Sequence, residues 1–227
     1  IYCMRNASPL VASHTEDGSF IASDMVALLK YTKDYFVVPE EHIVVMKGDS
    51  ITLYTMDGEV EEPKMLHVDW DTTAAQKGGY DFFMQKEIYD QPEALHNTIM
   101  PRIHNNRADF TADNISDDIF KGVNRVIVTA CGTAWHAGLI GRHLIEAMIR
   151  IPVTVELASE FRYMNPILDE HTLVVVITQA GETADSLAEL RLANERGAKT
   201  ISIVNVKGSS IARESDYVLY THAGPEI

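Results

Sequence analysis

The second half of the chain alternates short apolar runs with longer stretches in which apolar residues recur at helical spacing. The run from Leu173 to Ile177 has no polar position, which is typical of a strand buried on both faces of a sheet. The pattern predicts strands at 125–130, 153–157, 173–178, 200–205 and 217–220, and helices at 133–149 and 183–196. Helical connections impose parallel pairing with right-handed crossovers. We therefore predict an α/β domain with a doubly wound parallel sheet over residues 115–227.

The first part of the chain, residues 1–70, has shorter apolar segments separated by turn residues, and this pattern predicts a β-rich domain. Strands are predicted at 9–13, 20–22, 35–38, 42–46 and 51–55, with one short helix at 25–30. Ser23 and Asp24 precede that helix as capping residues. The sequence Met56-Asp57-Gly58-Glu59 is typical of a hairpin turn of the Asp-Gly type.

Residues 71–114 follow neither pattern and are interpreted as an interdomain linker with a docking helix. Gly78-Gly79 interrupts the chain, and an amphipathic stretch begins at Phe82. Pro92 is expected to interrupt this stretch, because proline lacks the N–H that a helix interior requires.

The junction between the strand at 173–178 and the helix that follows is the most informative feature of the chain. It has the sequence Thr178-Gln179-Ala180-Gly181-Glu182-Thr183. A strand that turns through a glycine into a helix directs unpaired N–H groups at one point, and the helix dipole adds positive potential there. We therefore predict that this loop binds a phosphate group. A polar helix cap without a ligand is the alternative that the turn chemistry alone leaves open.

Two other phosphate-binding motifs, Gly-x-x-x-x-Gly-Lys-Ser/Thr and Gly-x-Gly-x-x-Gly, do not occur after a predicted strand. The ligand is therefore predicted to be a small phosphorylated metabolite. A second candidate loop, Cys131-Gly132-Thr133, follows the strand at 125–130. Ligands of doubly wound sheets bind beyond the carboxyl ends of the strands, so we expect the two loops to face one pocket.

Composition and charge narrow the functional class. Of the 227 residues, 46% are hydrophobic, which is enough for a core, and the formal net charge of −14 opposes binding to DNA, RNA or anionic lipid. The two cysteines, Cys3 and Cys131, cannot form a disulfide framework, which indicates a reducing compartment. No apolar stretch reaches the ~20 residues needed to cross a bilayer, and the N-terminus does not resemble a signal peptide. We expect a cytoplasmic protein with no nucleic-acid or membrane partner.

The residues at 128–138, 156–163 and 178–185 together resemble, in order and spacing, the first sugar-isomerase (SIS) domain of the glucosamine-6-phosphate synthase family. Residues 8–11, 20–24 and 84–92 resemble the end of that family's glutaminase domain and its interdomain segment. The resemblance covers essentially the whole chain. It implies that residues 1–70 are the C-terminal part of an N-terminal-nucleophile (class II) glutaminase domain, and that residues 115–227 are a truncated, flavodoxin-like SIS domain.

The family couples two reactions, and the resemblance implies the ligands of this chain. A glutaminase domain releases ammonia from glutamine, and an isomerase domain uses it to convert fructose 6-phosphate into glucosamine 6-phosphate. By position, the residues around the phosphate of either sugar would be Thr178, Gln179, Ala180 and Thr183. Those that line the sugar side would be Gly132, Thr133 and Ala134. The resemblance also implies a homodimer and no cofactor, with glutamine bound only in the full-length enzyme.

Two of these positions depart from the family's commonest pattern, in which serine often stands where this chain has Ala134 and Ala180. A hydroxyl donor is absent at each position. A neutral hydrogen bond contributes ~0.5–1.5 kcal/mol net and one to a charged group ~1.5–3 kcal/mol, so each absence is expected to weaken binding. The backbone N–H of Ala180 remains, and we expect binding to survive.

The catalytic residues of the family are expected to lie outside this chain, which we interpret as part of a longer polypeptide. A class II glutaminase needs an N-terminal cysteine whose α-amino group is the base, whereas this chain begins with Ile1 and Cys3 is internal. The residues for ring opening and proton transfer are expected after Ile227. We therefore assign no catalytic residue and expect the chain alone to form neither glutamate nor amino sugar.

Other polar residues have simpler interpretations than catalysis. Cys131 is more typical of a buried apolar position than of a reactive thiol, and Glu182 of a helix cap, with orientation of the sugar as its alternative role. The histidines show no metal-ligand spacing, so no metal is predicted. For the whole chain, the alternative function is a non-catalytic phosphosugar-binding SIS module. The acidic, β-rich first part favours the enzyme, because a regulator would carry a basic helix-turn-helix segment.

Overall fold

The structure, a computed structural model, describes residues 1–5, 9–68 and 77–224. The chain divides into two compact units, one formed mainly by residues up to Lys86 and the other by Glu87–Ala223. The domain boundary that the sequence predicts at 70–71 lies outside the described residues.

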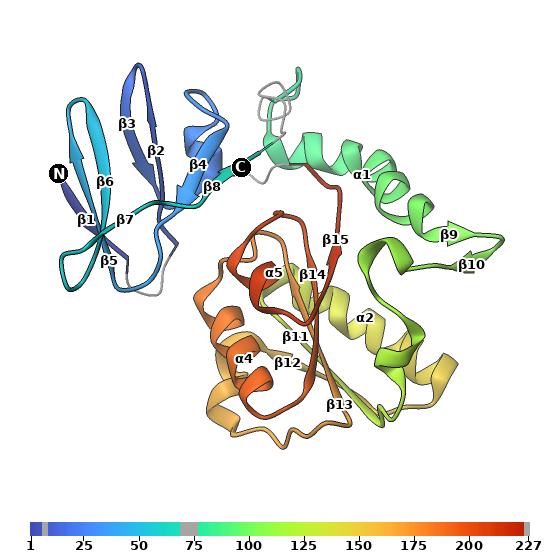
Figure 1. The fold of residues 1–227 in the computed structure, drawn as a ribbon. Helices are drawn as coiled ribbons and strands as arrows, with labels where there is room; N and C mark the ends of the chain where they lie inside the picture. Colours follow the sequence, from blue (N-terminus) through green and yellow to red (C-terminus); the bar gives the residue numbers. More distant parts are fainter. Residues whose placement is uncertain (6–8, 69–76, 225–227) are drawn as a thin grey trace. The chain divides into compact units, whose positions relative to one another are not determined.

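The first unit contains two four-stranded antiparallel sheets (Figure 1), with strand orders β1-β5-β6-β7 and β3-β2-β4-β8. Phe36 of one sheet and Val44 and Leu53 of the other belong to one buried cluster, so the sheets pack face to face. The strands are β1 (Tyr2–Met4), β2 (Val11–Thr15), β3 (Gly18–Ala22), β4 (Asp34–Val37), β5 (His42–Lys47), β6 (Ser50–Thr55), β7 (Val60–Glu61) and β8 (Met65–His67).

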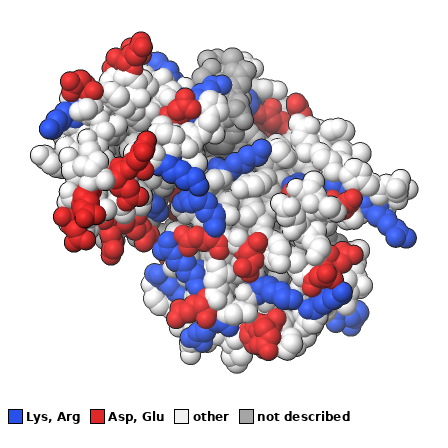
Figure 2. All heavy atoms as spheres, viewed as in Figure 1, with Lys and Arg blue, Asp and Glu red and all other residues white. Residues whose placement is uncertain are grey.

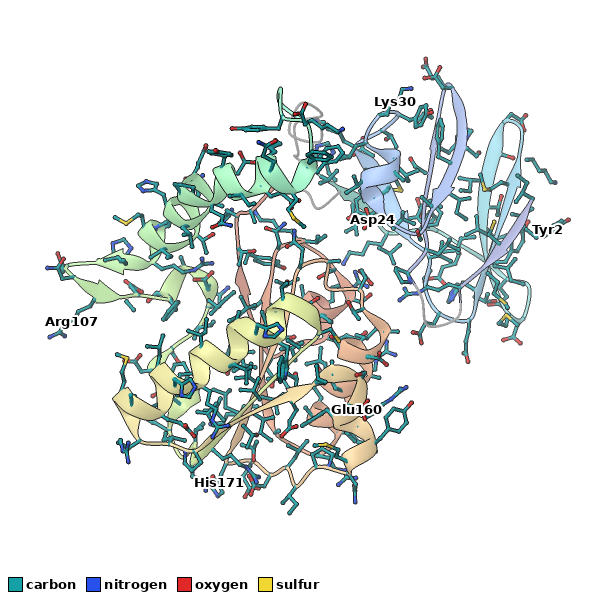
Figure 3. All side chains as sticks on the ribbon, turned by 180° about the vertical axis from the view of Figure 1, so that it is seen from behind. Tyr2, Asp24, Lys30, Arg107, Glu160 and His171 are labelled. Atoms are coloured by element: carbon teal, nitrogen blue, oxygen red, sulfur yellow. The ribbon has the colours of Figure 1, made fainter. Side chains whose placement is uncertain are left out.

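The predicted β-rich character of this part is confirmed, with two local differences. The helix predicted at 25–30 is a short 3-10 helix, η1 (Met25–Leu28), and its cap is Asp24 (Figure 3), which accepts the N–H of Val26 at 2.6 Å. The sequence did not predict β1, β7 and β8. These strands have two or three residues, which is too short for a periodic pattern.

Helix α1 (Phe83–Ile99) runs through Pro92, so the predicted interruption at this residue is wrong. No residue of α1 is buried. The carbonyl group four residues before Pro92 loses its helical N–H partner, but on an exposed helix water can replace that partner. After α1 the chain forms η2 (Met100–Arg102) and a small hairpin of β9 (Ile103–His104) and β10 (Arg107–Ala108), with Arg107 at its outer end in Figure 3.

The second unit is built on a five-stranded parallel sheet with the order β12-β11-β13-β14-β15. The strands are β11 (Arg125–Ala130), β12 (Val153–Leu157), β13 (Thr172–Thr178), β14 (Lys199–Val204) and β15 (Tyr217–Tyr220). The helices are α2 (Gly132–Ile149), α3 (Ala158–Phe161), α4 (Ala184–Glu195) and α5 (Ser210–Glu214), with the 3-10 turns η3 (Thr111–Asp113), η4 (Asp117–Phe120) and η5 (Arg162–Met164). The predicted doubly wound α/β fold is confirmed.

Successive residues of the strands contribute to separate cores on the two faces of this sheet. On one face Val128 lies in a cluster against which Ile145 of α2 packs, together with Ile115 and Ile119 from the segment before β11. On the other face Val176 packs in a cluster with Leu190 of α4. Each fully buried aliphatic side chain of this kind contributes about 1.5–3 kcal/mol to folding. The sheet is therefore a rigid base for the loops at its edges.

An ion pair fixes the segment between α1 and the sheet. Arg102 donates from Nε and Nη2 to the two carboxylate oxygens of Asp113 at 2.7 and 2.6 Å, and both side chains are largely buried. We expect Asp113→Asn to lower the free energy of unfolding by about 2 kcal/mol in urea denaturation. The substitution removes the negative charge that strengthens both hydrogen bonds from Arg102. Asp118→Asn, in the exposed pair with Lys121, is the control and should change it by less than about 0.5 kcal/mol. Equal losses in the two variants would contradict this interpretation.

Candidate functional site

The loops after β11 and β13 leave the same edge of the sheet next to each other. These strands are hydrogen-bonded parallel neighbours, with Ala130 opposite Ile177 at their carboxyl ends. The connection after β11 leads to β12 on one side, and the chain then returns to β13 on the other side of β11. The strand order therefore reverses between β11 and β13, and such a point is where ligands of doubly wound sheets bind.

All seven residues predicted to bind substrate are at this edge. Gly132, Thr133 and Thr183 are exposed, and the half-buried residues are Ala134, Thr178, Gln179 and Ala180. Three of them belong to the first turn of α2 and four to the loop 178–183, which precedes α4 and which we call the β13–α4 loop. None is enclosed in the core, so a solute can reach each of them.

The β13–α4 loop is held in a tight turn by its own residues. Gly181 has a φ of +70° and donates its N–H to the hydroxyl oxygen of Thr178 at 3.2 Å. Because that hydroxyl accepts a bond from Gly181, its own proton can be donated elsewhere. A Cβ atom at Gly181 would lie 2.2 Å from Oγ and 2.6 Å from Cβ of Ser209. Only glycine fits this turn.

The segment 205–211, which comes after β14, contacts the β13–α4 loop at three positions. The N–H groups of Asn205 and Val206 donate to the carbonyl of Gln179 at 3.2 and 3.3 Å, and that of Ile211 donates to the carbonyl of Gly181 at 3.0 Å. The Oε1 atom of Glu182 accepts the N–H of Ser210 at 2.9 Å. Glu182 is therefore a capping residue, as predicted, but it caps α5 and not the helix that begins beside it.

Several N–H groups at this edge remain available to an anion. In the described chain, the N–H groups of Ala180, Glu182 and Thr183 donate to no protein group. The first turn of α2 also has unpaired N–H groups, because its N-cap residue Cys131 provides no side-chain bond. The acidic residue in the first turn of α4, Asp185, has Arg162 at 3.8 Å, which offsets part of its charge. These unpaired N–H groups are the candidate donors to a bound anion.

A second carboxyl group on α4 is sealed in the core. Glu189 is 0% exposed, and neither of its carboxyl oxygens has a hydrogen-bond partner among the described residues. Burial raises the pKa of Glu189 to about 8. The nearby hydroxyl of Thr129 lowers this pKa, although it forms no hydrogen bond with the carboxyl group, and the charge of Asp185 raises it. The side chain is therefore neutral at pH 7. Because no solvent reaches Glu189, it cannot contact a ligand at the loops.

The surface charge is unevenly distributed. Figure 2 shows acidic side chains gathered over the first unit, whereas acidic and basic side chains are mixed over the second. Net charge is screened beyond about 8–10 Å at ordinary salt, but backbone N–H groups act on an anion at contact distance. The formal charge of −14 is therefore compatible with a phosphate at the loop edge of the sheet.

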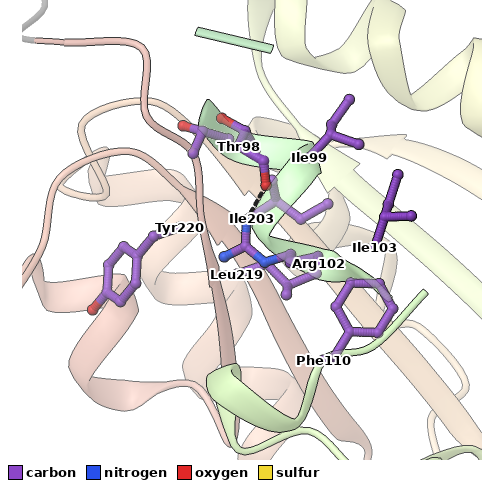
Figure 4. A pocket seen from close by; sticks show the side chains of 9 residues that line it. Thr98, Ile99, Arg102, Ile103, Phe110, Ile203, Leu219 and Tyr220 are labelled. Atoms are coloured by element: carbon purple, nitrogen blue, oxygen red, sulfur yellow. Dashed lines mark hydrogen bonds between the residues drawn. The ribbon is translucent and has the colours of Figure 1, made fainter. Parts of the chain in front are cut away.

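A cavity of about 200 Å³ lies elsewhere in the second unit, between the end of α1 and the edge strand β15 (Figure 4). The arginine in its wall, Arg102, is occupied by Asp113 and by the carbonyl of Thr98, at 2.7 Å. Apolar side chains form most of the rest of the wall. The lining residues are Thr98, Ile99, Arg102, Ile103, Phe110, Ile203, Leu219, Tyr220 and Thr221. None of them belongs to the two loops.

Within residues 1–5, 9–68 and 77–224, no three histidine, cysteine, aspartate or glutamate side chains are grouped so that they could hold a metal ion. In the same part of the chain, no helix combines the length and apolar character needed to cross a membrane. Cys3 and Cys131 are free thiols and half-buried, so Cys131 is less enclosed than the sequence predicted.

The sequence did not identify the segment 205–211 as part of the site. Gly208, with a φ of +74°, and Ser209, whose hydroxyl lies 3.4 Å from the N–H of Ala212, precede α5 as a helix start signal. This capping pattern could have predicted the helix. It could not have predicted that the segment contacts a loop about 28 residues earlier, because that contact depends on how β13 and β14 pair.

Comparison with known proteins gives consistent results along the chain. The family described as "SIS domain" matches residues 119–227. Glutamine–fructose-6-phosphate aminotransferases (isomerizing) match the whole chain, with 47% identity for the protein of Clostridium tetani and 45% for that of Clostridium acetobutylicum. The protein of Streptomyces coelicolor is 47% identical over 98% of the chain. The chain spans 38% of the length of the two Clostridium relatives and 36% of that of the Streptomyces relative.

A solved structure matches the larger part of the chain. The C-terminal domain of glucosamine-fructose-6-phosphate aminotransferase from Francisella tularensis has 38% identity and a TM-score of 0.63, covering 67% of this chain and 43% of its own. Tagatose-6-phosphate ketose/aldose isomerase from Escherichia coli is 18% identical with a TM-score of 0.53, covering 63% of this chain and 41% of its own. The second match reflects the fold alone.

Proposed function

Because the chain belongs to the family of glutamine–fructose-6-phosphate aminotransferases and contains a SIS domain at residues 119–227, we propose that it is the sugar-phosphate-binding section of such an enzyme. The β13–α4 loop holds the phosphate of fructose 6-phosphate or glucosamine 6-phosphate. The first turn of α2, with Gly132, Thr133 and Ala134, lines the sugar side. The observation that carries the proposal is the set of unpaired N–H groups at the point where the strand order reverses.

In the whole enzyme, we propose, the reaction converts fructose 6-phosphate and glutamine into glucosamine 6-phosphate and glutamate. This chain contributes binding, and none of its residues is assigned a catalytic role. Residues 1–70 and the linker 71–114 would be the end of the glutaminase domain and its connection to the isomerase. The expected homodimer and cytoplasmic location belong to the same proposal.

The affinity of variants that lack the hydroxyl of Thr178 or Thr183 distinguishes this proposal from a polar helix cap without a ligand. We expect Thr178→Val and Thr183→Val each to weaken fructose 6-phosphate binding about tenfold in isothermal titration calorimetry. Each change removes a hydroxyl donor to a charged group but keeps the side-chain shape. Thr178→Val also removes the acceptor of the Gly181 N–H, so its loss should be the larger of the two. Thr154→Val, on the exposed side of β12, is the matched control and should bind as the wild type does. Equal affinity in all four proteins would remove the proposed phosphate site.

A non-catalytic phosphosugar-binding module is the second candidate function. Both candidates bind a sugar phosphate, so the titration tests binding but does not distinguish between them. The similarity of the whole chain, including the β-rich first unit, to aminotransferases supports the enzyme section over the module. A longer protein, in which this chain is joined to the parts of the aminotransferases that it does not span, should form glucosamine 6-phosphate. A non-catalytic module would not form this product.

A further inference from the structure

The β13–α4 loop does not fix its own position. Within it, the bond from Gly181 to Thr178 is local, whereas the hydrogen bonds to the carbonyls of Gln179 and Gly181 and to Glu182 come from the segment 205–211. These contacts join residues that are 26 to 30 positions apart in the sequence, because Asn205, Ser210 and Ile211 bond to Gln179, Glu182 and Gly181, respectively. The position of the loop is therefore set by the segment 205–211.

Glu182 is the side chain that makes this connection. Its Oε1 atom accepts the N–H of Ser210 at 2.9 Å. Its Oε2 atom has essentially no solvent exposure and no hydrogen-bond partner among the described residues. The carboxylate is thus oriented toward the protein interior, because one oxygen is bonded to Ser210 and the other does not reach solvent. Orientation of the sugar, the alternative role considered from the sequence, would require direct contact, which does not fit this orientation of the carboxylate.

We propose that Glu182 is a positioning residue for the phosphate. By fastening the β13–α4 loop to the first turn of α5, it holds the neighbouring N–H groups in the orientation in which one anion can accept from several of them. Preformed donors need no reordering when the ligand binds, so affinity depends on their being held. The inference rests on the proposed function, because it assigns a residue to the same site.

The binding test compares three variants of this chain. Glu182→Ala removes the acceptor, and we expect it to weaken fructose 6-phosphate binding about tenfold in isothermal titration calorimetry. Glu182→Gln keeps an oxygen that can accept from Ser210, and its affinity should stay within about threefold of the wild type. Glu146→Ala is the matched control, because Glu146 Oε1 also accepts a backbone N–H, that of Val153, at 3.0 Å. That bond lies at the amino end of β12, so its loss should lower Tm without changing affinity.

A second measurement does not need a ligand. In hydrogen exchange of the free proteins, the amides of Gly181, Ser210 and Ile211, whose hydrogen bonds hold the loop in place, should exchange about fivefold faster in Glu182→Ala than in the wild type or in Glu146→Ala. Unchanged exchange and affinity in Glu182→Ala, or an equal loss of affinity in Glu146→Ala, would overturn the positioning role. A wild-type chain that binds neither fructose 6-phosphate nor glucosamine 6-phosphate would instead remove the proposed function, whatever the exchange shows.

Discussion

Replacing Gly181 by alanine is expected to abolish measurable sugar-phosphate binding, with a loss of at least about 100-fold, and to lower the free energy of unfolding by about 3 kcal/mol. The first cause is the backbone. Gly181 has a φ of +70°, a conformation that costs an alanine about 1–2 kcal/mol. The second cause is contact, because the added Cβ would lie 2.6 Å from the Cβ of Ser209 and 2.9 Å from Val204. Overpacking of this kind typically costs another 1–3 kcal/mol.

Relief of this clash requires the backbone to move. Rotation about χ1 of Ser209 would displace its Oγ atom, but its Cβ atom is fixed to the main chain. The β13–α4 loop would then separate from the segment 205–211, and the bond from Ile211 to the carbonyl of Gly181 would lengthen. The N–H groups that we propose to hold the phosphate would no longer converge.

Gly197→Ala is the control that separates strain from contact. Gly197 ends α4 with a φ of +78°, and a Cβ there would meet nothing within 4 Å. This variant should lose about 1 kcal/mol and bind as the wild type does. Calorimetric titration and urea denaturation of the two variants measure both quantities. Similar affinities of Gly181→Ala and Gly197→Ala would show that the β13–α4 loop is not where the ligand binds.

A second large effect is expected from the neutral carboxyl group of Glu189. Its contribution to the free energy of unfolding should fall as the pH rises from about 4.5 to about 8. Its pKa is about 8 in the folded protein and 4.5 in an unfolded chain. Below the lower value both states are protonated, so Glu189 has no effect on the balance. Between the two values only the unfolded state releases the proton, and rising pH therefore favours unfolding. At about 1.4 kcal/mol per pH unit, the whole range corresponds to about 5 kcal/mol.

Glu189→Gln tests this dependence, because an amide resembles the protonated acid and does not titrate. We expect the unfolding free energy of Glu189→Gln, relative to that of the wild type, to rise by about 1.4 kcal/mol per pH unit between pH 5 and 7.5. Other titrating groups are common to both proteins and cancel in the difference. Glu195→Gln, at an exposed position of the same helix, should run parallel to the wild type. Parallel curves for Glu189→Gln would mean that its carboxyl ionises normally in the folded protein.

The second unit was largely predictable because its central strands, β11, β13 and β14, are buried on both faces. The predicted strands at 125–130, 153–157 and 217–220 coincide with β11, β12 and β15, and α4 ends before Gly197 as predicted. Continuous apolar runs between helical stretches have few other interpretations. The prediction from local pattern was wrong at Pro92, because an exposed helix tolerates a proline that was expected to interrupt it.

The candidate site was predicted in part. Its seven residues were found from the turn at the end of β13 and from family resemblance, and the structure brings them to one edge of the sheet. The local pattern could not identify the role of Glu182, because its partner Ser210 is 28 residues away. Nor could it identify Glu189 as fully buried, since a glutamate between alanine and leucine in a helix is typical of a solvated face.

The sequence by itself determined the order and kind of the elements in the second unit and the turn that leads into α4. These properties depend on residues close together in the chain, because backbone preference and hydrophobic period are local. The tertiary structure decided that β11 and β13 are neighbours, that the segment 205–211 supports the β13–α4 loop, and that Glu189 is enclosed. Each of these depends on which strands pair and which helix faces pack together, and that is set by burial of apolar surface over the whole domain.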